Sequence, residues 1–340
     1  MKLFLPVFCL VLLCAGSVPV QAVEEPSPAP SPAKKLVLYT ALTATTPQIP
    51  LWSAIRSGWS AEYALEVEYW KTLDDLRGVM LAGKGDLWVG HLEGFAQAAR
   101  RGAPVTLLAV TGWKKFYFVA AAGDAAAQSL SLDLDSLAQA LRDRGEPLAV
   151  APQDSPAIAI LEDMGRRGGP AFAVAAMPPQ QLMLEMLRGS RRFALLPEPL
   201  VSALLAKAPG LRVAASLEEE FARRFGGPGT LPLAGIAVRT GFAEENPELV
   251  RELVSAMQAA AARLAANPEA AAGVLPERVR EAIGQDVLMN SLSRDLIHVL
   301  PAASARNEIL SFLRIVLPES YAPEAPDRPP SEHFFLPQPR

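Results

Sequence analysis

Two side chains capable of acid–base chemistry stand close together in a glycine-flanked segment. His91 and Glu93 lie within residues 90–94, directly after a short strand predicted at residues 86–89. A histidine donates and accepts hydrogen bonds and titrates near neutral pH, whereas a carboxylate only accepts them. Either both side chains contact a bound molecule, or Glu93 supports the start of a helix beside an exposed His91. Histidine is scarce in this chain, so we favour contact with a bound molecule. The pair falls short of the usual ligand set of a metal site, and none is predicted.

Hydroxyl side chains occupy two predicted loops that precede helices. Thr43 and Thr45 follow the first predicted strand, and a helix is expected to begin near Thr46 and Pro47, with Thr46 as its N-cap. Both threonines either contact a ligand or serve the turn and the cap. Ser155 has the same two interpretations, as an N-cap and as a ligand donor.

Two tryptophans and one glutamate complete the predicted binding residues. Trp52 falls in the first predicted helix, and Trp113 ends an apolar strand. Each either lines the site or packs in the core. Glu198 stands between Pro197 and Pro199, which restrain its backbone. It either accepts a hydrogen bond from a ligand N–H or fixes the turn between two lobes.

Other charged residues are expected to be solvated. Lys114 and Lys115 could attract an anion, but solvated lysines are the commoner case. The run Glu218-Glu219-Glu220 is predicted to be a solvated helix face. The net charge is −4, and lysine and arginine are scattered rather than aligned. Such a distribution lacks the basic footprint of a nucleic-acid-binding protein.

The sequence contains no common catalytic or cofactor motif. The patterns G-x-G-x-x-G, G-x-S-x-G and H-E-x-x-H and a phosphate-binding loop are all missing. No cofactor is therefore predicted.

The amino terminus is typical of a secretory signal peptide over residues 1–22. Lys2 precedes an apolar run at residues 3–13, and small residues lead to Ala22. The run is shorter than the roughly 20 residues that a membrane span needs. These features predict export to the periplasm.

Both cysteines of the chain, Cys9 and Cys14, lie in the predicted signal peptide. Cleavage after Ala22 would leave no cysteine, which excludes disulfides, thiolate catalysis and cysteine-bound metals. Lipid attachment at Cys14 is not expected, because Leu13 stands where such sites need a small residue.

Proline-rich segments flank the predicted folded region. Residues 23–35 carry a proline at every second position over part of their length and are predicted to be an extended linker. Residues 318–340 form a second proline-rich segment, predicted to be a disordered tail.

Short aliphatic runs alternate with amphipathic stretches over residues 36–317. Strands are predicted at residues 36–40, 65–70, 86–89, 105–110, 116–120, 148–151, 171–175, 193–196, 211–214 and 233–238. Helices are predicted from residue 46 onward, at 73–82, 93–101, 134–142, 156–166, 179–188, 200–207, 247–266, 276–284 and 303–316, and near Pro268. This order predicts an α/β fold with largely parallel sheets.

The chain is expected to form two β/α lobes with a ligand cleft between them and a helical C-terminal part. A Gly/Pro-rich break at residues 226–229 is followed by one strand and then by helices only. We therefore assign residues 36–120 and 231–317 to the first lobe and residues 121–230 to the second. In open α/β sheets, ligands bind beyond the carboxyl ends of the strands, near helix amino termini.

Several motifs in this order resemble type II periplasmic solute-binding proteins. They are the threonine-rich turn at residues 43–47, the LAGKGD motif at residues 81–86 and the GAPV motif at residues 102–105. Residues 193–199, with the sequence FALLPEP, resemble a Pro-Glu-Pro turn of the branch that binds nitrate, sulfonates, taurine and thiamine precursors. Residues 241–250 are also similar to that branch.

The resemblance implies a monomeric periplasmic receptor. It would capture a small organic solute (a sulfonate, an oxyanion, or an aromatic or heterocyclic compound) and deliver it to an ABC transporter permease. Two alternatives stay open. One is an enzyme of the thiamine-pyrimidine or menaquinone type on the same fold, with His91 and Glu93 as an acid–base pair. The other is a periplasmic ligand sensor. The predicted signal peptide argues against the enzyme, because those pathways are cytoplasmic.

Overall fold

The computed structural model describes residues 34–43, 45–121, 133–321 and 334–336. The predicted signal peptide and nearly all of the predicted linker lie outside these residues. Lys34 and Lys35 are described, and they begin the first strand.

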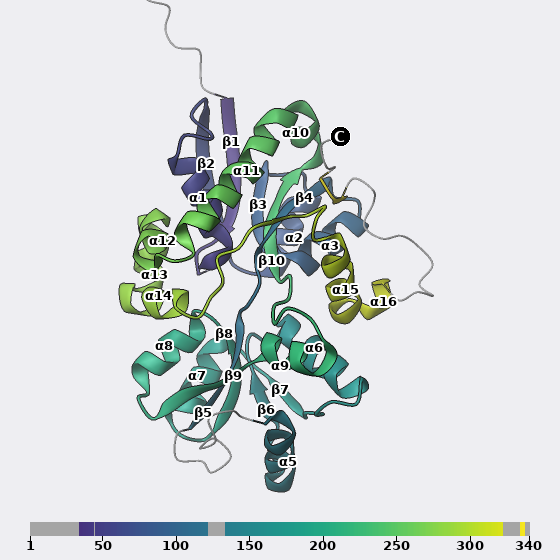
Figure 1. The fold of residues 1–340 in the computed structure, drawn as a ribbon, viewed down its shortest axis with the longest axis vertical. Coiled ribbons are helices and arrows are strands. Elements are labelled where there is room, and N and C mark those ends of the chain that lie inside the picture. Colours follow the sequence, from purple (N-terminus) through teal and green to yellow (C-terminus); the bar gives the residue numbers. More distant parts are fainter. Residues whose placement is uncertain (1–33, 44, 122–132, 322–333, 337–340) are drawn as a thin grey trace, which may run out of the picture. The chain divides into compact units, whose positions relative to one another are not determined.

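The first sheet has six strands in the order β11-β4-β10-β3-β1-β2 (Figure 1). β1 pairs in parallel with β2 and β3, whereas β10 is antiparallel to β3 and β4. The strands are β1 (Lys34–Ala41), β2 (Tyr63–Trp70), β3 (Leu87–His91), β4 (Val105–Gly112), β10 (Ala234–Arg239) and β11 (Leu300–Pro301).

The second sheet has five strands in the order β7-β6-β8-β5-β9. β6 pairs in parallel with β7 and β8, whereas β5 is antiparallel to β8 and β9. The strands are β5 (Phe116–Ala121), β6 (Leu148–Val150), β7 (Val174–Ala176), β8 (Phe193–Pro197) and β9 (Leu211–Ser216).

Two expectations about the sheets need correction. Both sheets are mixed rather than largely parallel, because β5 and β10 each run against both of their neighbours. The strand predicted at residues 116–120 was grouped with the first lobe, but β5 belongs to the second sheet. Hydrophobic patterning predicts that a strand exists, but not which strand pairs with it.

Helices separate most of the strands, and local signals explain where several of them begin. Thr72 caps α2 in a reciprocal capping box with Asp75, and Asp133 accepts two backbone hydrogen bonds at the start of α5. Three helices were not predicted, namely α10, α14 and α16, and α9 was indicated only by its glutamate run at residues 218–220. The helices are η1 (Thr46–Gln48), α1 (Ile49–Arg56), α2 (Leu73–Leu81), α3 (Leu92–Arg100), α5 (Leu134–Arg144), α6 (Pro156–Arg166), α7 (Pro179–Leu187), α8 (Leu200–Lys207), α9 (Leu217–Phe225), α10 (Thr240–Glu245), α11 (Pro247–Leu264), α12 (Pro268–Val274), α13 (Glu277–Ile283), α14 (Gln285–Leu292), α15 (Arg306–Val316) and α16 (Pro318–Tyr321).

Three apolar clusters hold the helices against the sheets. One contains residues of β4 and β5 together with residues of α3, α6, α9 and α15, so it is shared by the two sheets. A second packs α1 and α11 with α12 and α14 on the first sheet, and a third packs α7 and α8 on the second. The chain passes between the sheets at residues 113–115 and again at residues 226–233. The second passage bonds the carboxyl end of β4, where the Leu233 N–H donates to the Gly112 carbonyl, and the Glu198 N–H after β8 donates to the Lys115 carbonyl of the first passage.

The segment predicted to be a disordered tail contributes to the fold in its described part. α16 packs on α15, and the buried rings of Phe334 and Phe335 lie against the first sheet. Phe335 forms a parallel bridge with Leu107, and the Leu336 N–H donates to the Leu107 carbonyl at 3.1 Å. Two adjacent large apolar side chains supply enough buried area to hold such a short segment in place.

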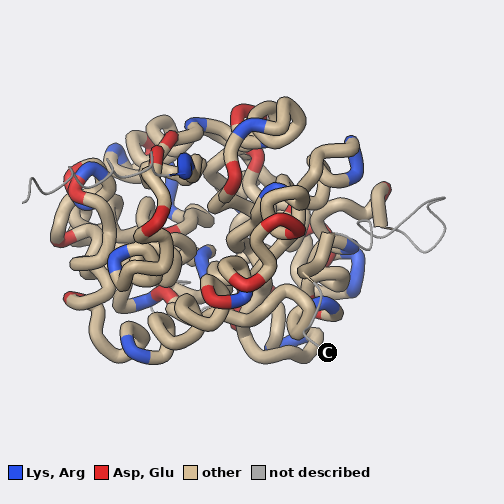
Figure 2. The backbone as a smooth tube through the Cα atoms, turned by 90° about the horizontal axis from the view of Figure 1, so that it is seen from above, with Lys and Arg blue, Asp and Glu red and all other residues tan. Residues whose placement is uncertain are grey.

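None of the helices in the described part of the chain is long and apolar enough to cross a membrane. Lysine and arginine are interspersed with aspartate and glutamate along the described backbone (Figure 2).

Candidate functional site

His91 and Glu93 stand where β3 ends and α3 begins. His91 is the last residue of β3 and the N-cap of α3, and its Nδ1 lies 3.2 Å from Glu93 Oε1. The Glu93 side chain is about nine-tenths buried, and its other oxygen, Oε2, is buried without a hydrogen-bond partner in the described structure. An unpaired buried carboxylate oxygen is costly, so Glu93 Oε2 marks a position where a donor from a bound molecule would be stabilised.

The glycine before this pair is required by close packing. A Cβ on Gly90 would lie 2.4 Å from Cδ2 of Leu76 and 3.1 Å from Cζ of Phe95. The backbone of β3 therefore approaches α2 and α3 closely, which fixes the point at which His91 leaves the sheet.

Charges from three other segments act on His91. Burial disfavours its charged form, but the charge and the hydrogen bond of Glu93 outweigh that effect, so the pKa of His91 lies above its ordinary value. Asp154, just before α6, raises this pKa further, and Lys115 opposes the rise. The His91 ring also meets Trp70 edge-on, with centroids 6.5 Å apart. Residues from β3, from the loop before α6 and from the β4–β5 link thus form one electrostatic cluster.

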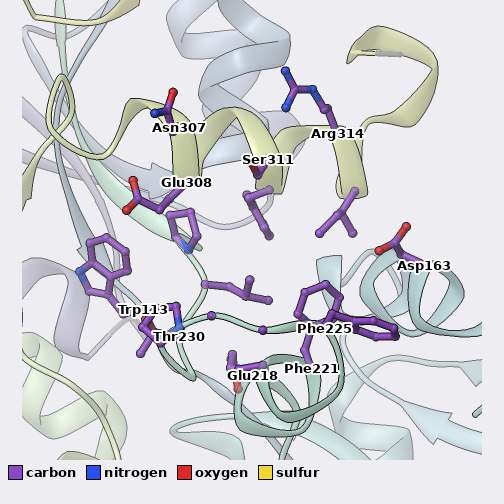
Figure 3. A pocket seen from close by; sticks show the side chains of 18 of the residues that line it. Trp113, Asp163, Glu218, Phe221, Phe225, Thr230, Asn307, Glu308, Ser311 and Arg314 are labelled. Carbon is purple, nitrogen blue, oxygen red and sulfur yellow. The ribbon is translucent and has the colours of Figure 1, made fainter. Parts of the chain in front are cut away.

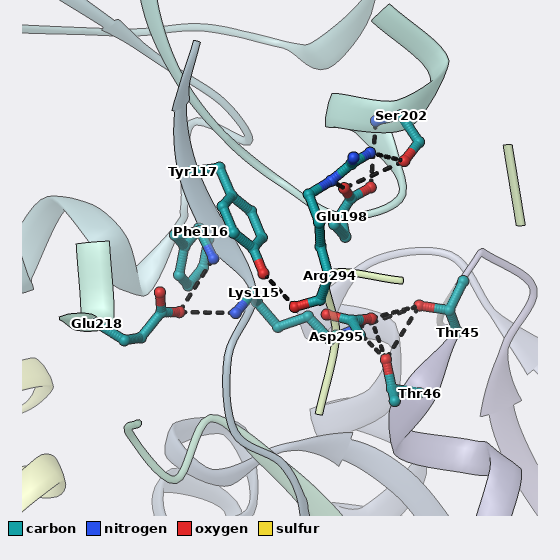
Figure 4. Close-up of polar contacts among 10 residues, drawn as sticks. All are labelled: Thr45, Thr46, Lys115, Phe116, Tyr117, Glu198, Ser202, Glu218, Arg294 and Asp295. Carbon is teal, nitrogen blue, oxygen red and sulfur yellow. Dashed lines mark hydrogen bonds and ion pairs between the residues drawn. The ribbon is translucent and has the colours of Figure 1, made fainter. Parts of the chain in front are cut away.

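Lys115 is the centre of a second, tightly connected group (Figure 4). Its ammonium donates to Thr46 Oγ1 at 2.7 Å and to Thr45 Oγ1 at 3.2 Å, and it forms an ion pair with Asp295. Both threonine hydroxyls also donate to Asp295 Oδ2. The Asp295 side chain is fully buried, and the Lys115 side chain is 11% exposed. Lys115 is therefore not the solvated lysine expected from the sequence.

The buried Glu198 forms an ion pair with the partly exposed Arg294. Arg294 Nε donates to Glu198 Oε1 at 2.7 Å, and Arg294 Nη2 donates to Ser202 Oγ at 2.6 Å. The Ser202 N–H and hydroxyl each donate to Glu198 at 3.1 Å. The Tyr117 hydroxyl donates to the Arg294 carbonyl at 2.6 Å, and burial raises the pKa of this tyrosine. Glu198 thus ties the segment after α14 to β8 and α8.

Glu218 accepts hydrogen bonds from the backbone where the linking segment at residues 113–115 meets β5. Its Oε1 receives the backbone N–H groups of Lys115 at 2.7 Å and Phe116 at 3.0 Å, and its Oε2 receives the Ser216 hydroxyl at 3.0 Å. The residue is only 1% exposed. Burial raises the pKa of Glu218, although these hydrogen bonds oppose the rise. The prediction that the glutamate run forms a solvated helix face is therefore wrong for Glu218 and Glu220, which α9 turns inward, and holds only for the exposed Glu219.

Glu218→Gln and Glu218→Ala are expected to behave differently. Glutamine keeps an acceptor for the two backbone N–H groups, whereas alanine leaves both unpaired at a cost of about 2–6 kcal/mol of unfolding free energy. Because the folded-state pKa of Glu218 is raised, its contribution to stability is fully present below the ordinary glutamate pKa. That contribution declines as pH rises through the raised folded value. The stability of Glu218→Gln relative to the parent should therefore increase with pH over this range. Chemical unfolding at several pH values measures both effects, and a pH-independent difference would contradict the assignment.

A cavity of about 760 Å³ lies beside Trp113 (Figure 3). Its walls include α9, α15 and the segment at residues 226–232. Phe221 and Phe225 stand on one side, and the guanidinium of Arg167 lies 4.1 Å from the centroid of the Phe225 ring. The indole N–H of Trp113 donates to the His298 carbonyl at 3.0 Å. Trp113 is the only predicted site residue in this wall.

The cavity and the predicted site do not coincide. The cavity walls are mostly apolar, and Glu218, the fully buried carboxylate among them, has its hydrogen bonds satisfied. Around His91, by contrast, a buried oxygen has no partner among the described residues, and groups from several segments act on the ring. Because a buried polar atom without a partner points to a missing partner, we take the residues around His91 and Lys115 as the candidate site.

The remaining residues predicted to bind a ligand lie at the surface, at a helix start or in the core. Thr43 is exposed, and Ser155 caps α6 by accepting the Ala157 N–H at 3.3 Å. Trp52 packs in the core of the first sheet, and its indole N–H donates to Gln48 at 2.9 Å. Thr46 is not an N-cap, because it is the first residue of η1 and its hydroxyl is bonded to Asp295.

The sequence did not predict Arg294 and Asp295, which complete the ion pairs of Glu198 and Lys115. They follow α14 and are separated by 96 residues from Glu198 and by 180 residues from Lys115, respectively. An arginine and an aspartate at the end of a helix are ordinary surface residues in a sequence, so no local signal identifies them. The described residues contain no group of three or more histidine, cysteine, aspartate or glutamate side chains that could hold a metal.

Comparisons with known proteins identify the fold. No protein-family model and no curated protein sequence matches the chain. An ABC transporter structure from Parabacteroides distasonis is 19% identical, with a TM-score of 0.67 over 91% of this chain and all of that one. The aliphatic sulphonate-binding protein SsuA from Escherichia coli is 13% identical, with a TM-score of 0.65 over 91% of this chain and 94% of that one. The nitrate-binding protein NrtA from Synechocystis PCC 6803 is 14% identical, with a TM-score of 0.61 over 86% of this chain and 83% of that one. The chain therefore has the two-lobed α/β fold of the type II periplasmic binding proteins, as the sequence motifs predicted.

Proposed function

We propose that this protein is a periplasmic receptor that captures a small organic solute and delivers it to an ABC transporter permease. The observation that carries the proposal is Glu93 Oε2, which is buried beside His91 at the carboxyl end of a strand and has no partner among the described residues. Ligands of open α/β sheets bind at such ends. Similar folds include proteins whose names describe binding of sulphonate or nitrate, which supports a binding role.

The proposed site is formed by residues from both sheets and their loops. Glu93 would accept a hydrogen bond from the solute, and His91 would donate or accept according to its protonation. Ser155 and Thr43 would supply hydroxyl contacts at the rim. Trp113 lines the separate cavity, so its contact with the solute stays a prediction from the sequence. Thr45 and Glu198 are already bonded within the protein, so we propose that they position the site and do not recognise the solute directly. Trp52 is proposed to support the frame from the core.

We propose binding without catalysis. The structures of similar fold are transporter binding proteins, which does not favour the thiamine-pyrimidine or menaquinone enzyme alternative. The periplasmic location rests on the predicted signal peptide. The proposed partner, a membrane permease, distinguishes the receptor from a sensor, since a receptor would co-purify with the permease and a sensor with a signalling kinase.

Thermal shift measurements over a panel of small organic solutes test the proposed function. A solute that binds only the folded state raises the melting temperature in a concentration-dependent way. A response from one chemical class would support the receptor and define its solute. Absence of any response across sulfonates, oxyanions, amines, pyrimidines and aromatic acids would count against it.

Glu93→Gln is expected to weaken binding of the responding solute by about 10-fold or more. Glutamine has nearly the same shape, but its amide N–H₂ faces the position where the solute would donate, so a hydrogen bond is replaced by an unfavourable contact. Isothermal titration calorimetry of the parent and the variant measures the change. Glu146→Gln, at an exposed position after α5, is the matched control and should bind as the parent does. Equal affinity of Glu93→Gln and the parent would remove Glu93 from the site.

A further inference from the structure

Three hydrogen-bond donors converge on a single carboxylate oxygen of the chain itself. The Lys115 ammonium and the hydroxyls of Thr45 and Thr46 all point to Asp295 Oδ2 (Figure 4). One buried cation flanked by two hydroxyls is an arrangement that binds an oxyanion. Here the oxyanion is Asp295, which the segment after α14 carries into this position.

Thr45 and Thr46 follow β1 and Glu93 follows β3, its neighbour in the sheet, so Asp295 and Glu93 stand at the same edge of the first sheet. Asp295 Oδ1 is buried and has no hydrogen-bond partner in the described structure, and the same holds for Glu93 Oε2. Two buried acceptors without donors are complementary to a molecule that brings N–H groups. An oxyanion would add further acceptors and leave both oxygens unpaired.

The charged side chains of the region are already paired with one another. Lys115 is neutralised by Asp295, and Arg294 is neutralised by Glu198. His91 is paired with Glu93, and Asp154 adds a further negative charge within electrostatic range of His91. Both cations are therefore already paired, and neither is free to bind an approaching anion.

We infer that Asp295 is a specificity-determining residue that fills the oxyanion position and restricts the site to solutes bearing hydrogen-bond donors. The solute class is an amine, an amidine or an amino-substituted heterocycle, whose N–H groups bond to Glu93 Oε2 and Asp295 Oδ1. This inference rests on the proposed function, because it concerns the solute of the same site.

Asp295→Ala tests the inference through a gained response. Removal of the carboxylate leaves Lys115 unpaired beside a space of carboxylate size, which formate or nitrate fits. Sodium formate and sodium nitrate should raise the melting temperature of Asp295→Ala by about 3 °C or more relative to equal sodium chloride. The same salts should leave the parent unchanged. The Lys115→Met/Asp295→Ala double variant keeps both threonines but lacks the cation, and it should show no anion response.

A panel on the parent protein keeps the test independent of whether Asp295→Ala folds. Benzylamine, benzamidine and 4-aminopyrimidine represent the donor class, and methanesulfonate and nitrate represent the oxyanions. A shift by a donor compound with none by the oxyanions supports the inference. A shift of the parent by methanesulfonate or nitrate overturns it and leaves the receptor function standing. The inference is also overturned if Asp295→Ala folds but gains no anion response. If no compound of any class shifts the parent, the receptor function itself is contradicted.

Discussion

Replacing Glu198 with alanine is expected to lower the free energy of unfolding by about 3–5 kcal/mol. Glu198 is buried and accepts hydrogen bonds from Arg294 and from both donor groups of Ser202. Its removal leaves the buried N–H and hydroxyl of Ser202 without their acceptor and takes the counter-ion from Arg294, which is only partly exposed. Urea unfolding followed by circular dichroism measures the loss.

Glu185→Ala is the matched control for this prediction. Glu185 also forms an ion pair with an arginine, since Arg191 Nε lies 2.9 Å from Glu185 Oε2. In this pair, however, the carboxylate as well as the arginine is partly exposed. Solvent screens such a pair, so no measurable change is expected. An unfolding midpoint of Glu198→Ala equal to that of the parent would show that Arg294 is not held by this carboxylate.

Ending the chain after Ser331 is expected to cost about 3–6 kcal/mol of unfolding free energy. This deletion removes the buried rings of Phe334 and Phe335, each of which contributes about 1.5–3 kcal/mol by leaving water. It also removes the hydrogen bond from Leu336 to Leu107 and exposes Arg306, whose guanidinium lies 4.5 Å from the centroid of the Phe335 ring. Differential scanning calorimetry of the shortened chain measures the effect.

Ending the chain after Leu336 provides the control for the truncation. It removes residues 337–340 and retains all described contacts of this segment. We expect this chain to have the same melting temperature as the full-length protein. If both truncated chains have the melting temperature of the full-length protein, the phenylalanine pair does not stabilise the fold.

Local chemistry made most helices and strands predictable from the sequence. α6 was predicted with the bounds that the structure has, because Ser155 and Pro156 together are a strong start signal. α11 begins at Pro247 as predicted, for a similar reason. The helical character of α9 was indicated by its glutamate run, but the run was predicted to be solvated, whereas Glu218 and Glu220 turn into the protein.

The candidate site was only partly predictable. His91 and Glu93 could be singled out, because their short spacing after a strand is a local feature. The ion pairs of Lys115 with Asp295 and of Glu198 with Arg294 depend on how the segment after α14 folds back. That contact joins residues far apart in the sequence, and neither hydrophobic periodicity nor a helix-capping motif predicts it. The mixed direction of the strands was missed for the same reason, since pairing is a tertiary property.

Native mass spectrometry of the folded protein tests the central claim, that this chain is a solute receptor, most directly. The protein would be purified under native conditions and measured before and after incubation with a low-molecular-mass extract of the producing cells. We expect a single adduct of one small organic molecule per chain, which is released on unfolding and is weakened in Glu93→Gln but not in Glu146→Gln. A spectrum that shows only the mass of the protein under both conditions would contradict the receptor function.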